Sequence, residues 1–255
     1  MIVPTILTAA ALITAVISGM AGLGGGTVLV AIMFGVDLPP KTVVPVHAAV
    51  QLVSNGARTV LFARYVKWAA LLSFLLAAVP TPFLAAPWVK HLDPRWVRLG
   101  MGLFILAVTW GSGLLSRLSV GDGSAGARAR AAFVALLVAG LLAGGLGMVV
   151  GATGALIAPF FLRDDWSKET TIGTKALCQG AAHVLKLAAF SAHGFALQAH
   201  LALIVPMSVA VVLGTVIGKR IGKRLSDKAF ALIFRLILSA LSLKLCVSAL
   251  LQLWR

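Results

Sequence analysis

Long apolar runs, separated by short polar segments, dominate the chain. Each run is long enough to cross a bilayer as a helix, which takes about 20 apolar residues. The pattern therefore predicts an all-α fold, a polytopic membrane bundle of eight hydrophobic segments. These segments cover residues 3–34, 42–63, 68–89, 96–116, 131–162, 170–192, 197–218 and 229–253.

The runs at 3–34 and 131–162 are longer than a single crossing requires. About 32 residues of straight helix extend about 48 Å, whereas the hydrocarbon core of a bilayer is about 30 Å thick. Glycines interrupt both runs, within 19–26 and again within 144–154. Backbone that leaves the helix inside a membrane must be surrounded by protein or line a water-filled cavity. We therefore expect broken or re-entrant Gly-rich helices beside a cavity.

The two interrupted runs also resemble each other. A constant separation of 128 positions pairs Gly19 with Gly147, Gly26 with Gly154, Thr42 with Thr170, Ala48 with Ala176, Gln51 with Gln179 and Phe62 with Phe190. Such self-similarity indicates a duplication. We predict a first transmembrane repeat at 1–118, a linker at 119–130 and a second transmembrane repeat at 131–255. Paired interruptions in two halves point to the binding site of a transporter.

Two topologies are compatible with this duplication. If each long run spans the membrane once, the halves are parallel; if each run is a hairpin, the halves are inverted. Lys and Arg residues gather in cytoplasmic loops. The hairpin arrangement divides the basic loop residues twelve to five between the two faces, and the parallel arrangement divides them eleven to six. The sharper division favours inverted repeats with both termini outside.

Composition supports a membrane protein and excludes an ordinary soluble domain. Hydrophobic residues make up 60% of the chain and charged residues 11%, against about 25% charged residues in soluble domains. The net charge of +15 comes from bases between apolar runs, which is typical of membrane loops and not of a nucleic-acid surface.

Cys178 and Cys246 lie in apolar runs without a CxxC spacing, so we expect no disulfide. The run from Ile2 to Ile17 lacks a basic start and a cleavage motif, and we interpret it as a membrane segment.

A stripe of polar side chains follows one face of the segment at 42–63. Its members lie four, seven, eight and eleven positions after the first, spacings that place all of them on one helical face. The stripe consists of His47, Gln51, Ser54, Asn55 and Arg58. The corresponding positions of the second half hold Lys175, Gln179, Ala182, His183 and Lys186. Each half thus carries one polar stripe with a cation at its far end.

Ionisable residues in a membrane normally face the bundle interior or a cavity, because a charge at the helix centre costs about 2.5–3.5 kcal/mol to insert. A plainer interpretation stays open for the same residues. Arg58 and Lys186 lie near segment ends, where long stems can reach the interface. His47 and Lys175 lie near the opposite ends, and the two glutamines of the stripes can simply hydrogen-bond neighbouring helices.

No acidic residue of the predicted membrane segments balances these cations. All seven acids fall in loops or at segment edges: Asp37, Asp93, Asp122, Asp164, Asp165, Glu169 and Asp227. A buried charge without a partner is very unfavourable. We therefore interpret the missing counter-charge as a small anionic substrate. This argues against cation channels and sodium symporters, which need carboxylates or carbonyl cages.

The glycine breaks offer a second kind of anion contact. After each break we expect a helix to restart, near Thr27 and near Ala155. A helix N-terminus presents free N–H groups and the positive end of the helix dipole. The candidate backbone lining comprises Gly24, Gly25, Gly26 and Thr27 in the first half, and Thr153, Gly154 and Ala155 in the second. Alternatively, these glycines only allow close helix packing.

Other chemistry is sparse in the predicted membrane segments. His47 and His183 are their only side chains that titrate near neutral pH, and whether they carry a proton is left open. The chain lacks HExxH, GxSxG and an intramembrane Asp pair. We predict that the protein is not an enzyme and uses no cofactor or metal.

The two breaks resemble those of the sulfite exporter TauE/SafE family, also called the 4-toluene sulfonate uptake permease family. The resemblance rests on Gly22-Leu23-Gly24-Gly25-Gly26-Thr27-Val28-Leu29-Val30 and on Gly151-Ala152-Thr153-Gly154-Ala155-Leu156-Ile157-Ala158-Pro159. It covers nearly the whole chain. Ala31 departs from the proline usual after the first break, and Ala152-Thr153 departs from paired glycines. The resemblance implies a transporter of small sulfur-containing anions such as sulfite, sulfoacetate or other sulfonates.

Together these features predict a multi-pass protein of the plasma membrane with an anion site between two repeats near the midplane. Arg58 and Lys186 would supply charge, while Gln51, Gln179, Asn55 and His183 would supply hydrogen bonds. One repeat would move against the other in alternating access. An anion channel and a non-transporting membrane scaffold are the alternatives. The expected partners are a small anionic substrate and the lipid bilayer, without nucleic acid; a homo-oligomer stays open.

Overall fold

The computed structural model describes residues 2–21, 25–36, 38–89, 91–116, 125–161, 163, 165–221 and 227–254. These residues form helices joined by short connections, which confirms the predicted all-α fold. Four helical stretches are long and apolar enough to cross a membrane. They are Ile2–Met20, Trp68–Trp88, Ala129–Val150 and Leu197–Ile221.

Several of the predicted apolar runs are divided into more than one element. Up to residue 116 they are α1 (Ile2–Ala21), α2 (Gly25–Gly35), α3 (Pro40–Leu61), a 3-10 turn (Ala63–Tyr65), α4 (Trp68–Ala78), α5 (Pro80–Val89) and α6 (Pro94–Ser116). The later elements are α7 (Ala125–Leu141), a π-helical segment (Leu142–Leu146), α8 (Gly147–Val150), α9 (Gly154–Ile157), a 3-10 segment (Ala158–Phe161), α10 (Lys168–Ala192), a 3-10 turn (Leu197–His200), α11 (Leu201–Ile221) and α12 (Asp227–Leu253). The segment predicted as one run at 68–89 is divided at Pro80, which cannot donate a helical hydrogen bond.

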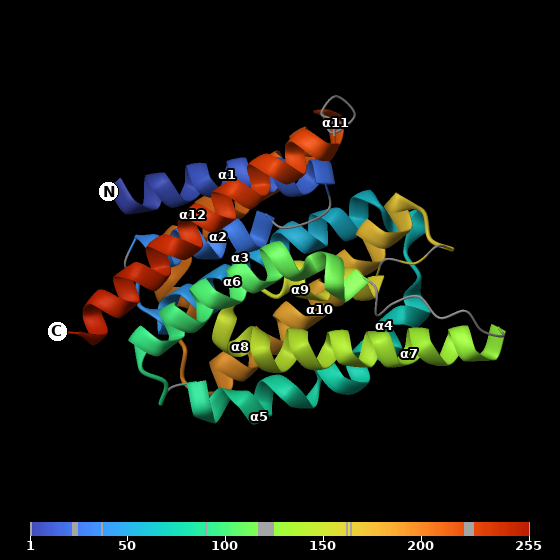
Figure 1. Cartoon of the computed structure of the whole chain (residues 1–255), viewed down its shortest axis with the longest axis horizontal. Coiled ribbons are helices and arrows are strands. Elements are labelled where there is room, and N and C mark those ends of the chain that lie inside the picture. The colour runs from blue at the N-terminus through green and yellow to red at the C-terminus, as the bar shows by residue number, and fades with distance from the viewer. Residues whose placement is uncertain are drawn as a thin grey trace.

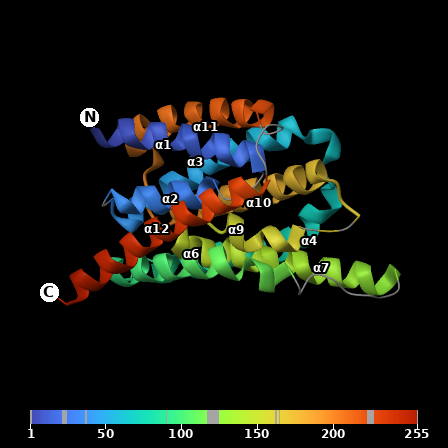
Figure 2. The same ribbon diagram turned by 45° about the horizontal axis from the view of Figure 1, so that its top comes forward.

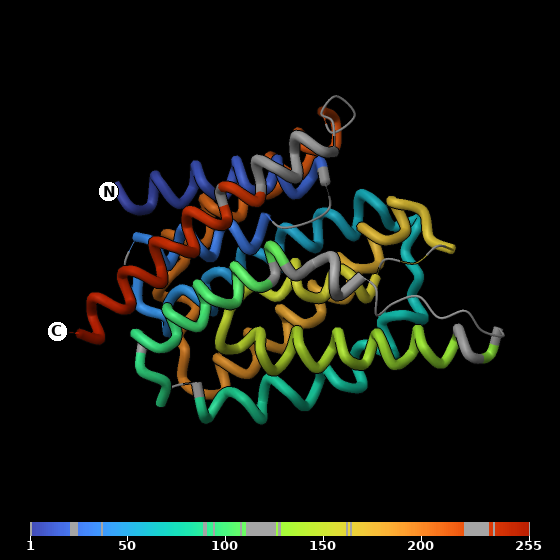
Figure 3. Tube along the Cα trace, in the orientation of Figure 1, coloured from blue at the N-terminus to red at the C-terminus, as the bar shows by residue number. Residues whose placement is uncertain are grey.

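Both long glycine-containing runs fold back on themselves. A Cβ atom at Gly25, the first residue of α2, would collide with the Thr14 carbonyl and lie 2.6 Å from Ser18 Cβ, both on α1. In the second run, α7 contacts the segment at Ala158–Phe161. Gly151 makes the intervening turn with φ of 79°, a conformation that favours glycine. α1 and α2 also contact each other, so both long runs are hairpins, although the first turn lies outside the described residues. Figure 3 shows how the chain doubles back between α7 and α9.

Helices before residue 117 pair with helices after residue 124. α1 packs along α11, α4 along α7, α3 along α10, and α6 along α12. Figures 1 and 2 show α1 and α11 side by side, with both termini at the same end of the bundle. Gly19, Gly214 and Gly218 allow the α1–α11 contact, because a Cβ at any of them would collide with a carbonyl of the opposing helix.

The outer surface of the bundle is apolar, as a lipid-facing surface should be. On α11 every fourth residue is exposed and apolar: Val205, Val209, Leu213 and Ile217. The opposite face of this helix is buried and rich in small residues. Tryptophans near helix ends are also exposed, at Trp68, Trp88, Trp96 and Trp254. Tryptophans in such places are typical of the membrane–water interface.

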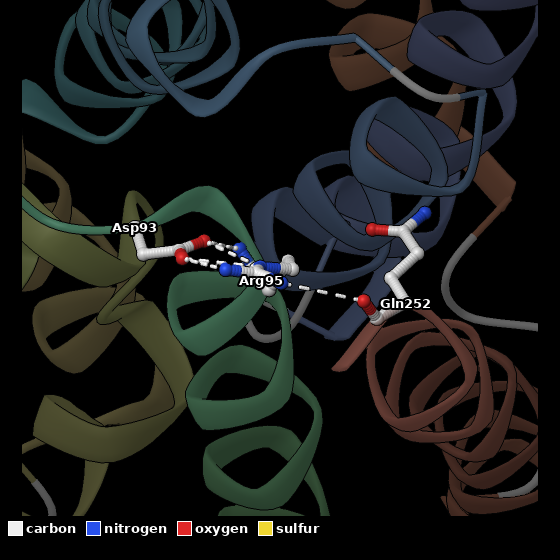
Figure 4. A network of polar contacts seen from close by, with 3 residues as sticks. All are labelled: Asp93, Arg95 and Gln252. Atoms are coloured by element: carbon white, nitrogen blue, oxygen red, sulfur yellow. Dashed lines mark hydrogen bonds and ion pairs between the residues drawn. The ribbon is translucent and has the colours of Figure 1, made fainter. Parts of the chain in front are cut away.

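Charged loop residues pair with one another at the ends of the bundle. Asp93 and Arg95 form an exposed ion pair of 2.7 Å before and within the first turn of α6. The Arg95 guanidinium, which donates hydrogen bonds to the Asp93 carboxylate, lowers the pKa of that carboxyl. Arg95 also donates to the backbone carbonyl of Gln252 at 3.4 Å, so it joins the start of α6 to the end of α12 (Figure 4).

Candidate functional site

A cavity lies where α3 and α10 cross, beside the starts of α2 and α9. About 330 Å³ of space between its walls is not filled by protein atoms, and part of this space is open to the outside. Among the described residues, neither a carboxylate nor a Phe, Tyr or Trp ring lines it. The lining residues are Ser18, Gly26, Thr27, His47, Gln51, Arg58, Ala152, Thr153, Gly154, Lys175, Gln179 and His183. Ten of these are residues that the sequence predicted for the site.

The two predicted polar stripes face each other across this cavity. The His47 ring on α3 meets the His183 ring on α10 edge-on, with centroids 6.2 Å apart. Lys175, near the start of α10, interacts electrostatically with Arg58, near the end of α3. Lys186, near the end of α10, interacts with His47, near the start of α3. The stripes are therefore antiparallel, and each far-end cation lies beside the first member of the other stripe.

Local sequence explains how these two helices begin. Pro39 is extended, and Pro40 occupies the first turn of α3, where its missing N–H group removes no hydrogen bond. Ser167 caps α10, because its hydroxyl accepts from the Thr170 N–H at 3.2 Å. Both starts lie in the loops, so the polar residues further along each helix fall within the bundle.

The cations of the stripes are buried inside the bundle. Arg58 is 5% exposed, Lys175 3% and Lys186 1%. Their side chains are enclosed by protein, which favours a place inside the bundle over long stems that extend along its outer surface. Burial of this kind requires compensation from polar groups or a ligand.

Neutral groups of two helices hold the Arg58 guanidinium. Nη1 donates to the Ser18 hydroxyl at 2.9 Å, and Nη2 donates to the Ser54 hydroxyl at 3.2 Å. Nε donates to the Ser54 carbonyl at 3.3 Å. Because these acceptors carry no charge, they orient the guanidinium without neutralising it. An anion in the cavity would meet an already positioned cation.

Lys186 lies behind the cavity wall. Its Nζ donates to the Gly151 carbonyl at 3.0 Å and lies close to Gly147. Lys186 therefore connects α10 to the turn of the second hairpin. In the structure it is Lys175, and not Lys186, that lines the cavity together with Arg58.

Each helix restart packs a glycine against a glutamine. A Cβ at Gly26 would lie 3.0 Å from Gln51 Cδ, and a Cβ at Gly154 would lie 2.8 Å from Gln179 Nε2. The two contacts involve residues that the 128-residue separation had paired. In both, the missing side chain gives the glutamine amide room beside the cavity.

The two helix starts differ in what they offer an anion. α2 continues for 11 residues from Gly25, whereas α9 has only four residues before it tightens into a 3-10 segment. A helix of a single turn has few aligned peptide dipoles. The dipole contribution predicted for Gly154 and Ala155 is therefore small, although Gly154 does line the cavity.

Four of the predicted residues do not line the cavity, and one lies outside the described residues. Gly25 faces α1, and Ala155 is not part of the lining. Asn55 and Lys186 are both buried, and neither lines the cavity. Gly24 falls among the residues that the structure does not describe.

Several buried polar atoms around the cavity have no hydrogen-bond partner among the described residues. They are Thr27 Oγ1, His47 Nδ1, Asn55 Oδ1 and His183 Nδ1. Buried polar groups are nearly always hydrogen-bonded, so a cluster of exceptions calls for water or a ligand. Within the described ranges, no three His, Cys, Asp or Glu side chains come together as metal ligands would.

Sequence reasoning missed Ser18 and Ala152. Ser18 lies on α1, within an apolar run, and the equivalent position 128 residues later is Leu146. The second half therefore has no polar residue at the corresponding position that could have pointed to Ser18. Its role becomes visible only when the hairpin brings α1 beside the end of α3.

A comparison with known protein families finds a match that covers most of the chain. A protein-family model described as "Sulfite exporter TauE/SafE" matches residues 7–245. No curated protein and no solved structure matches the chain.

Proposed function

The chain belongs to the sulfite exporter TauE/SafE family, and we propose that it carries small sulfonate- or sulfite-type anions through the cavity by alternating access. Membership implies a multi-pass transporter of sulfur-containing anions in the plasma membrane, and not an enzyme. The finer proposal concerns which of these anions bind and which residues bind them.

One observation carries the proposal. Two buried cations, Arg58 and Lys175, line a cavity to which the described part of the chain contributes no carboxylate. A sulfonate or sulfite group has several oxygens that accept hydrogen bonds, and charge-assisted hydrogen bonds are the strongest of these. Gln51, Gln179 and Thr27 add polar groups around the same space.

The lining also favours compact, hydrophilic anions. Apart from glycines, only Ala152 lacks a polar side-chain atom, and an aromatic substrate would find no ring to stack on except the two histidines. Sulfoacetate and sulfite therefore suit the cavity better than an aromatic sulfonate such as toluene sulfonate. Sites for aromatic ligands are lined mostly by apolar and aromatic side chains.

We further propose that the two halves, divided by the linker at 119–130, are inverted repeats. The antiparallel crossing of α3 and α10 and the hairpin form of both long runs support this arrangement. It also corresponds to the sharper division of Lys and Arg between the faces.

Truncation of the buried cations tests the site. We expect Arg58→Ala and Lys175→Ala, at the two cations that line the cavity, to weaken sulfoacetate and sulfite binding and to slow their transport. Removing one partner of a buried charge contact costs about 2–5 kcal/mol, which corresponds to at least a tenfold loss of affinity. Arg64→Ala and Lys168→Ala are matched controls, because both residues are exposed. Wild-type behaviour of both cavity variants would refute the assignment of charge.

Two rival functions make different predictions. An anion channel would give ohmic currents after a concentration jump, whereas a carrier gives slow, saturable flux. A non-transporting scaffold would show no thermal stabilisation by any small anion, whereas a ligand that binds only the folded state raises the melting temperature.

A further inference from the structure

Two histidines lie in the cavity wall without a role in fixing Arg58. His47 is 1% exposed and His183 is 6% exposed, and their rings meet edge-on with centroids 6.2 Å apart. They come from different helices, α3 and α10, and both line the cavity. The charged groups around them are Lys186 beside both rings, Arg58 beside His183, and Lys175 in the same lining.

The hydrogen bond of His47 decides where a proton can bind. Its Nε2 lies 2.8 Å from the Gly26 carbonyl oxygen, which can only accept. The ring must therefore carry its hydrogen on Nε2, and Nδ1 keeps a free lone pair. Nδ1 of His47 and Nδ1 of His183 are both buried and make no hydrogen bond of ordinary geometry among the described residues. The Gly151 backbone also interacts with His47 and favours a proton on its ring.

We propose that His47 and His183 form one proton-binding site, through which a proton crosses the membrane together with each anion. A proton taken from one side binds to an imidazole nitrogen while the anion occupies the cavity. Both leave on the other side, and only an N–H bond is made and broken. The inference rests on the proposed function, because it needs an anion in the cavity.

Electrostatics couples the two ligands. Without an anion, a proton on either ring adds positive charge beside Lys186 and Arg58, which is unfavourable. With an anion present, the proton meets an opposite charge about 5 Å away, and at an effective dielectric constant of about 20 this attraction of about 3 kcal/mol changes the affinity of each for the other about 300-fold. Such coupling is reciprocal: if the anion favours the proton, the proton favours the anion by the same factor.

The geometry also sets the stoichiometry. Two imidazolium rings at a centroid distance of 6.2 Å would repel each other as well as the neighbouring cations. Groups this close titrate as a pair, so the first proton hinders the second. The site should hold one proton for each anion.

Reconstituted full-length protein tests the coupling. Liposomes containing a pH-sensitive dye would receive radiolabelled sulfoacetate, whose two acid groups stay ionised between about pH 6 and about pH 8, so that any proton must bind the protein. We expect about one proton to enter with each sulfoacetate. His47→Gln and His183→Gln keep a hydrogen-bonding amide but cannot take up a proton, so protons moved per anion should fall at least fivefold in each. His193→Gln is the control, because His193 lies at the end of α10 outside the lining and should keep the ratio.

A second measurement covers variants that fold but no longer transport. Adding sulfoacetate to purified wild-type protein in weak buffer should take up protons, and the affinity should rise up to tenfold for each unit by which the pH falls. Sulfoacetate transport or binding without proton uptake would overturn the coupling and leave the anion site intact. An unchanged ratio in both His→Gln variants would overturn the assignment to this pair. If wild-type protein neither binds nor moves sulfoacetate, the proposed function fails, and the coupling fails with it.

Discussion

Gly26→Ala should weaken anion binding by displacing Gln51. A Cβ at this position would lie 3.0 Å from both Cδ and Oε1 of Gln51, where ordinary contacts are 3.4 Å or longer. The glutamine is flexible, so its amide should swing away while the backbone stays in place. A hydrogen bond to a charged group contributes about 1.5–3 kcal/mol. The dissociation constant for sulfoacetate should therefore rise about 10- to 150-fold, measured by titration calorimetry on purified protein.

The effect can be traced to the glutamine with a double-mutant cycle. In a Gln51→Ala background, Gly26→Ala should cause little further loss, because the displaced amide is already absent. Gly56→Ala, on the exposed face of α3, is the control, since a Cβ there meets nothing within 4 Å. Full additivity of the two substitutions, or unchanged affinity in Gly26→Ala, would refute the reasoning. Gly154→Ala should behave in the same way toward Gln179.

Three further predictions concern stability, each measured as the melting temperature of the purified protein. Gly140→Ala should destabilise strongly, by about 2 kcal/mol or more, because its Cβ would collide with the Phe74 carbonyl in the α4–α7 contact and backbone cannot swing away; an unchanged melting temperature would contradict this packing. Thr174→Val should cost about 1–3 kcal/mol, because the Lys67 N–H, which donates to the buried Thr174 hydroxyl at 3.0 Å, would lose its acceptor; equal stability would mean that water replaces the hydroxyl. Asp93→Asn should lower stability slightly near neutral pH, since a lowered carboxyl pKa stabilises the folded state above the ordinary value of 3.8. That difference should vanish as the pH falls through the lowered folded value, and a difference that grows in acid would contradict the sign.

Periodicity explains why much of the fold could be predicted. Apolar runs marked the helices, glycine clusters marked both turns, and the four-residue spacing of His47, Gln51 and Asn55 placed them on one face. These signals are local, so they appear in the sequence without knowledge of the partners. The duplication itself stays a prediction, although the paired glycine–glutamine contacts are what it would produce.

Pairing between distant segments could not be predicted in this way. Nothing in the local pattern shows that Ser18 reaches Arg58 across the first hairpin, or that Lys175 and not Lys186 accompanies Arg58 in the lining. Both depend on the antiparallel crossing of α3 and α10. The shortness of α9 was also hidden, because the apolar run continues smoothly through the 3-10 segment that follows it.

The pairing of α1 with α11 has a consequence for how the protein is made. During synthesis α1 enters the membrane long before residues 201–221 exist, so the face of α1 that contacts α11 stays without its partner until then. The same delay applies to α4, which waits for α7. Contacts between segments so distant in sequence form slowly, and exposed unfinished surfaces attract quality-control proteases and chaperones. A chain truncated before α11 should therefore be degraded in the cell, and the newborn protein should be most vulnerable until its last helices arrive.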